Sequence, residues 1–565
     1  MSQYQAVLDH LVTQVRAAFS RQIRDKNHPA HGAYLTDVYA GGHPNADHVS
    51  NASDLVKACQ VFLAPGSPLE EDADLLLRIR DSIAFQRRWQ RPTGLIDLAS
   101  LNWESPPDTG FTVESCSAVV AVARAKAGSE GAGVIAHELG EYVRTAAQGM
   151  IGRGFHTPNH RWVVCSALTQ AMVLFPELPA REYVESILAE GVDIQADGEY
   201  TERSTGIYNA VCNRAFRFMA DCLGKPELLE PVRKNLDFMS YVFHDDGSVV
   251  TSISNRQDQG QRVVPLMSFD SFFDMAQRDG NGVWATIADR LFDRRLPDLP
   301  HASGWLLQPF LQHPEYQTES LPRQPMPDQF AKLFPISGVW RVKRGPLSAT
   351  AATENRTMLA VKYGQVDLRS VKISGTYHRA SNVRASTMQP IPDGVRLFNQ
   401  GSRNGFSGYR LPFGKPVPFG EFYRTEWDRK QWLLPELNQT IDIVEVENGL
   451  DLRLKSEGGL DRVPMEIECA FDGPGEWETD GSVVQAINGQ SAILKSGTGV
   501  FRRGDQAISI GPGGDVHRDW NMRESHPTKD VFRVLITFQT PFDRTLEIRY
   551  GTWSLATRGL VGSPR

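Results

Sequence analysis

The sequence predicts an α+β protein with two domains, an N-terminal (α/α) toroid over residues 1–335 and a C-terminal antiparallel β-sandwich over residues 336–565. Three observations predict this fold. Apolar residues recur at helical spacing in the first part, and they alternate with polar residues from about Gly338 onward. The length of 565 residues also provides enough chain for two hydrophobic cores.

Several segments of the first part carry apolar residues at positions i, i+3, i+4 and i+7. Some of them place Ala, Ser, Cys and Gly on more than one face, which is typical of helices buried on both sides. We therefore expect them to supply the inner ring of a double-layered toroid. The segments are 114–127, 159–175, 208–224 and 228–243.

The second part contains many short alternating runs that are separated by Gly, Pro, Asn and Asp. Such strands in series favour an antiparallel sandwich. The proline-containing segment 303–330 is the expected linker between the two domains. The expected strands lie within 338–345, 357–364, 366–374, 441–456, 463–471, 491–504, 507–511, 532–540 and 545–553.

Composition and charge exclude several classes of protein. Hydrophobic residues make up 41% of the chain and charged residues 22%, as in an ordinary globular protein. The formal net charge is −7 and no basic block stands out, so we expect no nucleic-acid partner. No apolar run reaches the roughly 20 residues of a membrane span, so we expect no membrane partner.

The N-terminus and the cysteines predict a cytoplasmic protein. Residues 1–26 have helical spacing and lack the apolar run of a signal peptide. None of the six cysteines forms a CxxC pair, and five lie in apolar helical segments, so we expect reduced, buried thiols. They are Cys59, Cys116, Cys165, Cys212, Cys222 and Cys469.

One expected helix begins with polar side chains. Thr157 is a good N-cap and Pro158 a good first residue, so Asn159 and His160 fall in the first turn. Free backbone N–H groups and the positive end of the helix dipole lie there as well. This helix start is therefore a candidate receptor for a carboxylate or phosphate.

Two further helix starts are polar. Asp108 or Thr109 can cap a buried helix within 102–125, and Ser204 or Thr205 can cap the one that begins near Tyr208. The pair at 197–198, Asp-Gly, predicts a tight turn before the latter helix. If these are inner helices of one ring, their N-terminal ends open on the same rim.

The Asn159-His160 pair and the segment DGEYTERSTGIYN at 197–209 resemble the heparinase II/III-like and alginate-lyase-like polysaccharide lyases. The order of a helical toroid and a strand-rich domain also resembles that group. The resemblance implies that Asn159 and His160 neutralise a uronate carboxylate. It implies that Tyr208 is the catalytic tyrosine.

A lyase of this kind removes the C5 proton of a uronate and expels the oxygen at C4. Donors near the carboxylate stabilise the charge that develops in the transition state, with Arg203 or Arg256 as helpers. A phenol is protonated at neutral pH, so Tyr208 can serve as the acid. The base is left open between His378, Tyr409 and Tyr208 itself.

Further side chains complete the expected binding site. We expect substrate contacts from Trp103, Asp108, Glu202, Arg203 and Arg256. Trp162 and Tyr200 also flank the motifs and are candidates for stacking on sugar rings, although packing is expected for at least one of these aromatic residues. The segment 254–260, which contains Arg256 and Asp258, could bind a sugar or form a solvated loop, and its spacing favours the loop.

We expect neither a cofactor nor a metal, because His378, His517 and His526 lack ligand-like spacing. The expected partner is a uronate-containing oligosaccharide, imported and cleaved by exo action. A homo-oligomer is an open alternative.

Two other functions remain open. A glycoside hydrolase on a similar toroid would need two facing carboxylates, for which Asp108, Asp197, Glu199 and Glu202 are available. A non-catalytic carbohydrate-binding protein would keep the cleft without the chemistry.

Overall fold

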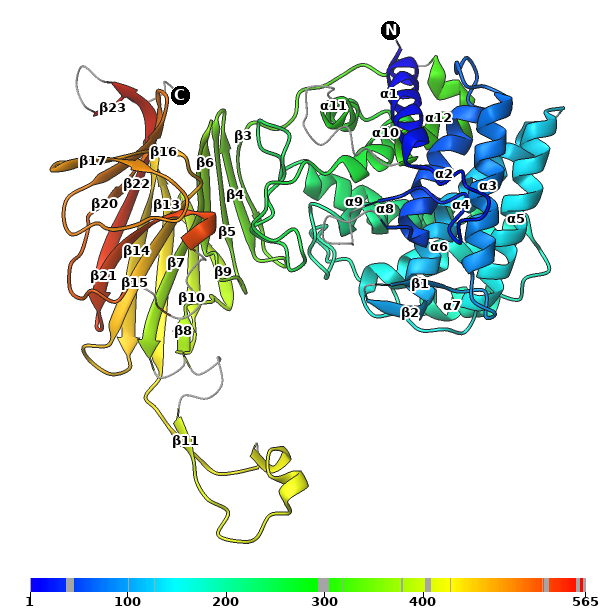
Figure 1. The fold of residues 1–565 in the computed structure, drawn as a ribbon. Coiled ribbons are helices and arrows are strands. Elements are labelled where there is room, and N and C mark those ends of the chain that lie inside the picture. Colours follow the sequence, from blue (N-terminus) through cyan, green and yellow to red (C-terminus); the bar gives the residue numbers. More distant parts are fainter. Residues whose placement is uncertain are drawn as a thin grey trace. The chain divides into compact units, whose positions relative to one another are not determined.

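The computed structural model describes most of the chain, and its contacts divide it into two compact units, Met1–Met326 and Pro327–Arg565. The predicted fold class is confirmed: the first unit is an (α/α) toroid and the second a β-sandwich (Figure 1). The described residues are 2–36, 45–99, 101–126, 128–292, 304–318, 320–377, 380–401, 408–426, 428–520, 522, 528–554 and 559–561.

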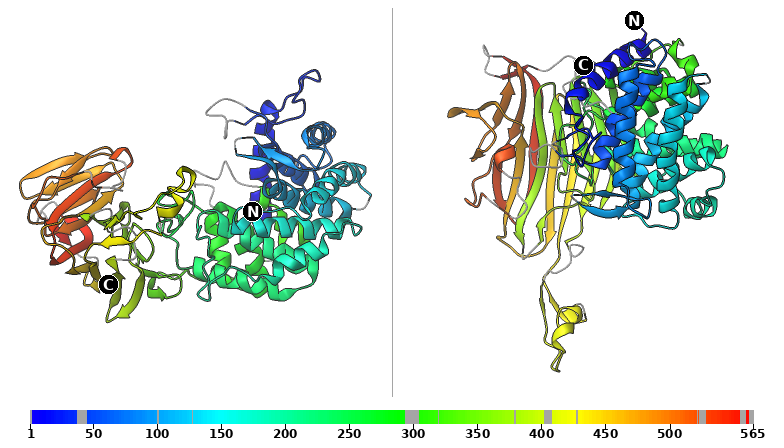
Figure 2. Two further views of the ribbon diagram at one scale, coloured as in Figure 1. Left: turned by 90° about the horizontal axis from the view of Figure 1, so that it is seen from below. Right: turned by 45° about the vertical axis from the view of Figure 1, so that its right-hand side comes forward.

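The helices of the first unit alternate between an inner and an outer ring (Figure 2). Each inner helix packs against the next inner helix and against the outer helix that follows it in the chain. The inner helices are α2 (His48–Leu63), α4 (Pro106–Ala125), α6 (Pro158–Leu174), α8 (Tyr208–Leu223) and α10 (Phe269–Asp279). The outer helices are α3 (Ala73–Trp89), α5 (Glu130–Met150), α7 (Arg181–Ala189), α9 (Glu230–Met239) and α11 (Gly282–Leu291).

Small residues let the inner helices approach closely. α4 and α6 are buried over most of their length, and a Cβ added at Gly110 of α4 would lie 3.3 Å from Cγ2 of Val164 in α6. Of the four segments expected in the inner ring, three form the inner helices α4, α6 and α8. The fourth, 228–243, forms the outer helix α9. Among the described residues, no helix has both the length and the apolar character to cross a bilayer.

The remaining elements of the first unit close its ends. α1 (Gln3–Ala18) packs on α2, and the ribbon of β1 (Ile96–Leu98) and β2 (Asn102–Ser105) leads into α4. The shorter helices are η1 (Phe19–Arg21), η2 (Pro226–Leu229), η3 (Leu266–Ser268), η5 (Gly304–Leu306), α12 (Gln308–Gln312) and η6 (Pro314–Gln317). All six cysteines are free thiols, and only Cys222 is partly exposed.

Much of the expected linker is part of the toroid. Pro309 lies in the first turn of α12, where a proline is favourable. Leu306, Leu307 and Phe310 are fully buried, and the Phe310 ring lies 4.5 Å from the ring of Phe273. The prediction of a linker was therefore wrong for residues 304–317, because the proline starts a helix there that buries its apolar side chains.

The second unit consists of two sheets packed face to face. One has the strand order β17-β16-β19-β20-β22-β14-β13-β10-β9, with β23 on β22, and the other β18-β21-β15-β7-β6-β5-β4-β3, with β8 on β7. The described pairs are antiparallel except β18–β21. Apolar side chains from both sheets form the core, including Val371, Ile443, Leu452 and Ile467.

The strands of the first sheet are β9 (Thr387–Ile391), β10 (Gly394–Asn399), β13 (Leu437–Val446), β14 (Gly449–Gly458), β16 (Gly475–Thr479), β17 (Ser482–Ala486), β19 (Gly499–Arg503), β20 (Gln506–Gly511), β22 (Asp543–Ser554) and β23 (Gly559–Val561). Those of the second are β3 (Gln329–Phe334), β4 (Val339–Arg344), β5 (Leu347–Ala352), β6 (Leu359–Tyr363), β7 (Val366–Tyr377), β8 (Ala380–Asn382), β15 (Pro464–Phe471), β18 (Ser491–Ile493) and β21 (Phe532–Gln539).

A long excursion, here called the arm and comprising residues 408–433, leaves the sandwich between β10 and β13. Its strands β11 (Gly408–Arg410) and β12 (Gln431–Leu433) pair with each other, and it contains the short helices η8 (Phe419–Glu421) and η9 (Arg424–Glu426). Figures 1 and 2 show the arm projecting away from the sandwich.

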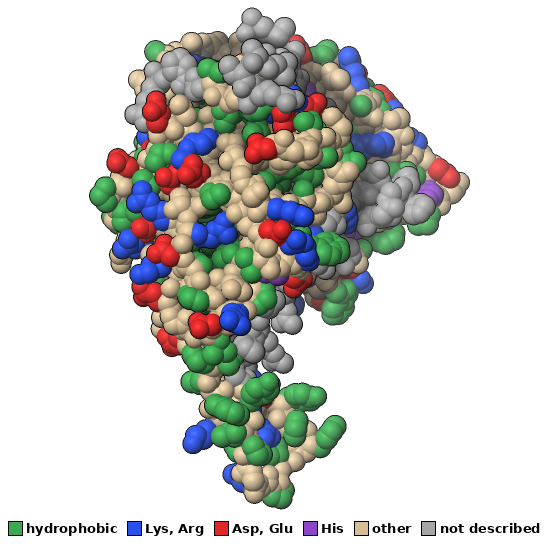
Figure 3. Space-filling model, turned by 90° about the vertical axis from the view of Figure 1, so that its left-hand side faces the viewer, with side chains coloured by type: hydrophobic (Ala, Val, Ile, Leu, Met, Phe, Trp, Pro, Cys, Tyr) green, Lys and Arg blue, Asp and Glu red, His purple; other side chains and the backbone are tan. Residues whose placement is uncertain are grey.

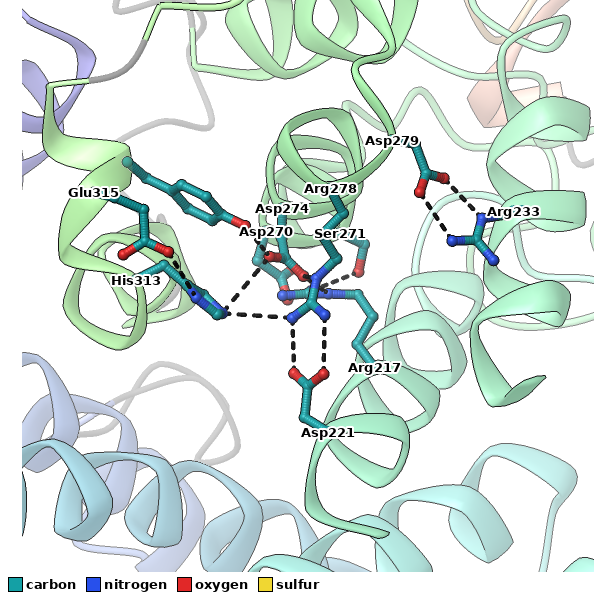
Figure 4. A network of polar contacts seen from close by, with 11 residues as sticks. Arg217, Asp221, Arg233, Asp270, Ser271, Asp274, Arg278, Asp279, His313 and Glu315 are labelled. Carbon is teal, nitrogen blue, oxygen red and sulfur yellow. Dashed lines mark hydrogen bonds and ion pairs between the residues drawn. The ribbon is translucent and has the colours of Figure 1, made fainter. Parts of the chain in front are cut away.

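Buried ion pairs join α8 to α10 (Figure 4). Asp274 is fully buried and accepts hydrogen bonds from Nε of Arg217 at 2.7 Å and Nε of Arg278 at 2.8 Å. Nη1 of Arg217 also donates to Asp270 at 2.7 Å, and Asp270 is paired with the buried Arg214. These pairs fix α8 relative to α10 because each charge is neutralised only in this arrangement.

We expect Asp274→Ala to lower the free energy of unfolding by about 3–5 kcal/mol, because it leaves two guanidinium groups without their shared buried carboxylate. The matched control is Asp279→Ala, which breaks the partly exposed pair with Arg233 shown in the same figure and is expected to cost about 1 kcal/mol or less. Urea denaturation measures both variants. Equal losses would contradict the stabilising role of the buried pairs.

Candidate active site

The start of α6 is occupied by a carboxylate of the protein itself. Thr157 holds the N-cap position, but its side chain makes no capping hydrogen bond. Instead, the backbone N–H of Asn159 donates to Oε2 of Glu202 at 2.8 Å, and Nδ2 of Asn159 donates to Oε1 at 2.7 Å. The sequence predicts an anion receptor at this helix start, and in this structure Glu202 occupies it.

Both N–H groups of the Asn159 side-chain amide are already hydrogen-bonded. Its second hydrogen goes to Oγ1 of Thr157 at 2.9 Å, and Oδ1 is buried with no hydrogen-bond partner among the described residues. The atom left for another group is therefore an acceptor. Asn159 was expected to donate to a substrate carboxylate, and it can do so only if Glu202 or Thr157 releases the amide.

A tight turn brings Glu202 to this position. The N–H of Gly198 donates to the carbonyl of Gln195, and Gly198 has a φ of 101°. A Cβ there would lie 2.3 Å from the carbonyl oxygen of Lys234, so only glycine fits. The turn predicted at 197–198 is confirmed. Arg203 then adopts the left-handed region with a φ of 51°, which turns the chain toward α8.

The start of α8 is held by Ser204 and Asp258. Oγ of Ser204 accepts from the backbone N–H of Tyr208 at 3.1 Å and donates to Oδ1 of Asp258 at 3.1 Å. Asp258 also accepts from the N–H of Gly206 at 2.9 Å. The predicted cap at Ser204 or Thr205 was wrong, because Ile207 holds the N-cap position without a side-chain hydrogen bond and the hydroxyl of Thr205 donates to the carbonyl of Val250.

The prediction of a solvated loop at 254–260 was wrong for Asp258. Its side chain is almost completely buried, and Ser254 adds a hydrogen bond to it at 2.8 Å. The loop is therefore fixed from within by a carboxylate with three polar partners. This restrains Arg256, two residues earlier in the chain.

Arg256 connects Glu202 with Tyr208. Its Nε lies 3.3 Å from Oε1 of Glu202, and its Cζ lies 4.9 Å from the centre of the Tyr208 ring. Asn159, Glu202, Arg256 and Tyr208 thus form a continuous chain of contacts, here called the Glu202 cluster. Burial raises the pKa of the Glu202 carboxyl, and the hydrogen bonds from Asn159 and the charge of Arg256 oppose that shift.

His160 is half-buried beside this cluster, with its ring edge-on to Phe111 at 6.1 Å. Burial lowers its pKa to about 4; the charges of His156 and Arg256 act in the same direction, and Asp108 opposes them. The imidazole is therefore neutral at pH 7. Its Nδ1 is buried and has no hydrogen-bond partner among the described residues.

Asp108 lies in the first turn of α4 and does not cap it. The N-cap is Ser105, because Pro106 and Pro107 fit the first turn, so the expectation of a cap at Asp108 or Thr109 was wrong. Oδ2 of Asp108 accepts from Oγ of Ser105 at 2.5 Å and from Nδ2 of Asn102 at 3.0 Å. The start of α4 lies beside the same site, because the ring of Phe111 in this helix is 6.1 Å from that of His160.

The other predicted binding residues differ in exposure. Trp103 is 72% exposed, and the guanidinium of Arg91 lies 5.9 Å from its ring. Trp162 and Tyr200 are fully buried and are therefore not available to stack on a sugar. Arg203 is partly exposed.

The candidate bases of the second unit stay predictions. Tyr409 lies in β11 of the arm, and its side chain is 75% exposed. His378 lies outside the described residues. Among the residues that the structure describes, no three His, Cys, Asp or Glu side chains gather as a metal site would require.

Two residues of the site were not predicted from the sequence. Asp258 was interpreted as solvated, and His156 was not considered, although its charge influences the pKa of His160. His156 lies four residues before His160, which is a weak local signal. No local signal identifies Asp258, because its partners at Ser204 and Gly206 lie some fifty residues away in the chain.

No family model matches the chain, and no curated protein matches it. Solved structures of two polysaccharide lyases do. A xanthan lyase from Paenibacillus has 11% identity and a TM-score of 0.56, over 97% of this chain and 57% of the lyase. A chondroitin AC lyase from Streptomyces coelicolor A3 has 12% identity and a TM-score of 0.55, over 98% of this chain and 80% of the lyase.

These similarities show the fold over almost the whole chain. The chain spans little more than half the length of the xanthan lyase. The closer resemblance to heparinase II/III-like enzymes stays a prediction.

We expect Glu202→Ala to lower the free energy of unfolding by about 2–4 kcal/mol, because two donors of Asn159 lose their buried acceptor. Glu202→Gln retains one carbonyl oxygen and is expected to cost less. Urea denaturation at pH 7 compares the two. If both variants were as stable as the wild type, Glu202 would not hold the start of α6.

The low pKa of His160 predicts a loss of stability in acid. The folded protein binds fewer protons than the unfolded chain between pH 6.5 and about 4, so the contribution is complete above pH 6.5 and disappears as the pH falls toward 4. We expect the wild type to lose about 1–2 kcal/mol relative to His160→Gln over this range, allowing for the partial exposure of the ring. Parallel denaturation curves at pH 7 and pH 4 measure the difference, and a constant difference would contradict it.

Proposed function

We propose that this protein is a polysaccharide or oligosaccharide lyase that cleaves a uronate-containing glycan by β-elimination. The observation that carries the proposal is the position of Arg256, which lies against the phenol ring of Tyr208 and beside Glu202 at the starts of two inner helices. A cation and a phenol in contact suit a reaction that binds a carboxylate and transfers a proton. The shared fold of the xanthan and chondroitin AC lyases supports the proposal.

Arg256 is the group best suited to neutralise the uronate carboxylate. His160 is uncharged at neutral pH and so contributes a hydrogen bond but no charge. The amide of Asn159 is bound to Glu202 and Thr157, so its role in the proposed reaction is to orient Glu202 unless the substrate displaces it. Stabilising the enolate-like charge in this way is worth about 3–4 kcal/mol per preorganised donor.

Tyr208 is the proposed proton donor to the leaving oxygen at C4. Its ring is held by the start of α8, where Ser204 binds the N–H of Tyr208 itself. The proton at C5 needs a base, for which Tyr208 itself, Tyr409 and His378 are the candidates. Trp103, whose ring is exposed, is the proposed stacking residue, and Asp108 and Arg203 complete the proposed contacts.

Three of the four carboxylates considered for a hydrolase, those of Glu199, Glu202 and Asp108, are buried and hydrogen-bonded, which favours elimination over hydrolysis. Burial raises the pKa of Glu199 to about 7, and its Oε1 accepts from Asn209 and from the N–H of Tyr200. Glu199 is fully buried, and Glu202 and Asp108 are nearly so and hydrogen-bonded. A hydrolase needs two carboxylates that face the scissile bond, with room for water in the inverting case.

The chain length of the substrate is part of the proposal. Exo action on imported oligosaccharides predicts release of one small unsaturated product from the outset, whereas endo action would produce a range of sizes. Chromatography of early products distinguishes the two modes.

We expect Tyr208→Phe to lower kcat by about 10²–10⁴-fold, because the proton donor is lost while the ring and its contact with Arg256 remain. The assay follows the near-ultraviolet absorbance of the unsaturated uronate with a panel of uronate oligosaccharides. The matched control is Tyr183→Phe, which removes a hydroxyl in α7 that binds the carbonyl of Arg153.

Three results would contradict the proposal. Near-normal turnover by Tyr208→Phe would remove this residue from the mechanism. Cleavage without an absorbing product would identify a hydrolase instead. Tight binding of glycans without any product would identify a non-catalytic binding protein.

A further inference from the structure

The arm has an unusual composition. Its 26 residues include seven aromatic residues, five basic residues and three acidic residues, so that it carries a net charge of +2 while the remainder of the chain carries −9. Aromatic and basic residues alternate along it. The groups are Phe413 with Lys415, Tyr423 with Arg424, and Lys430 with Trp432.

The described aromatic side chains of the arm do not form a core. None of its described residues is buried. Tyr409 and Trp432 lie opposite each other in the β11–β12 ribbon and are 75% and 70% exposed. Phe419 and Tyr423 are still more exposed, and Figure 3 shows apolar side chains spread over the surface of the arm.

The cations of the arm are largely free of acidic partners. Among the described residues of the arm, Arg410 is in an ion pair with Glu426, whereas Lys415, Arg424 and Lys430 are in none. Arg429 lies against two rings, 4.7 Å from Phe413 and 5.4 Å from Phe422. The arm therefore presents aromatic faces and unneutralised positive charges side by side.

An isolated two-stranded ribbon is marginally stable in water. Exposed aromatic residues that contribute nothing to a local core indicate a binding surface. The core of a protein–protein interface is depleted in charged residues, particularly lysine. Alternating rings and cations suit instead a ligand in which apolar faces and negative charges alternate.

We propose that the arm is an accessory binding site for an acidic polysaccharide. The inference rests on the proposed function, because the ligand is the longer form of the proposed substrate. The C–H faces of its sugar rings pack on Tyr423 and Trp432, as aromatic side chains bind other partly apolar rings. Its carboxylates pair with Lys415, Arg424 and Lys430, and the positive arm offsets the repulsion between a polyanion and the negative remainder of the chain.

Affinity electrophoresis of the full chain in gels containing chondroitin sulfate, xanthan or neutral dextran tests the inference. The wild type is expected to be retarded by the acidic polymers and not by dextran. We expect Tyr423→Ala combined with Trp432→Ala, and separately Arg424→Ala combined with Lys430→Ala, to weaken retardation about tenfold. The second pair should also reduce the sensitivity of binding to salt.

The matched control is Trp89→Ala, which removes an aromatic residue outside the arm that is 49% exposed. It should bind as the wild type does. Wild-type retardation in both arm variants, or no retardation of the wild type by either acidic polymer, overturns the inference. So does a dimer in analytical ultracentrifugation that the arm variants dissociate, because the rings would then bind a second copy of the chain.

Turnover separates this inference from the proposed function. The arm variants are expected to cleave a short uronate oligosaccharide at the wild-type rate, because the substrate binds at the toroid. Loss of retardation with unchanged turnover supports both conclusions. A wild type that binds acidic polymers through the arm but cleaves none of the oligosaccharides contradicts the proposed function alone.

Discussion

The candidate site depends on one buried carboxylate, that of Glu202. It binds the backbone and the side chain of Asn159 and pairs with Arg256, so it connects the start of α6, the turn before α8 and the loop that contains Arg256. Burying a carboxylate is unfavourable unless its oxygens are hydrogen-bonded. The three segments are therefore held together, because each of them supplies a group that contacts this carboxylate.

A second polar layer lies below the site and fixes the helices that carry it. Asp108, His160 and Tyr208 are each followed, six residues later, by a buried polar residue, namely Glu114, Ser166 and Arg214. Six residues correspond to about 9 Å along a helix. Burial raises the pKa of Glu114 to about 7, while the charge of Arg214 and a hydrogen bond with Ser166 oppose this shift. Arg214 in turn pairs with Asp270, so α4, α6, α8 and α10 are connected at one level.

Local patterns in the sequence predicted the parts of this structure that depend on neighbouring residues. The change of period near Gly338 predicted a helical part followed by a strand-rich part. The turn at Gly198 was predicted from the Asp197-Gly198 pair, and the structure shows that only glycine fits there. The carboxylate at the start of α6 could not be predicted in this way. Glu202 lies 43 residues from Asn159, and Thr157 looked like a sufficient cap. Asp258 was misinterpreted for the same reason. The segment around it has the pattern of a loop, and its burial depends on Ser204 and Gly206, which lie far away in the chain.

The charges of the site explain how substrate binding and proton transfer would be coupled in the proposed reaction. Arg256 is the cation shared by Glu202 and Tyr208, and His160 is neutral, so an incoming uronate carboxylate competes with Glu202 for the same guanidinium. In the proposed reaction Arg256 would turn to the substrate, and Glu202 would lose an opposing charge while the burial that already raises its pKa remained. Protonation of Glu202 would then remove a negative charge from beside the sugar carboxylate. Under this proposal Glu202 keeps Arg256 in place until the substrate carboxylate replaces it.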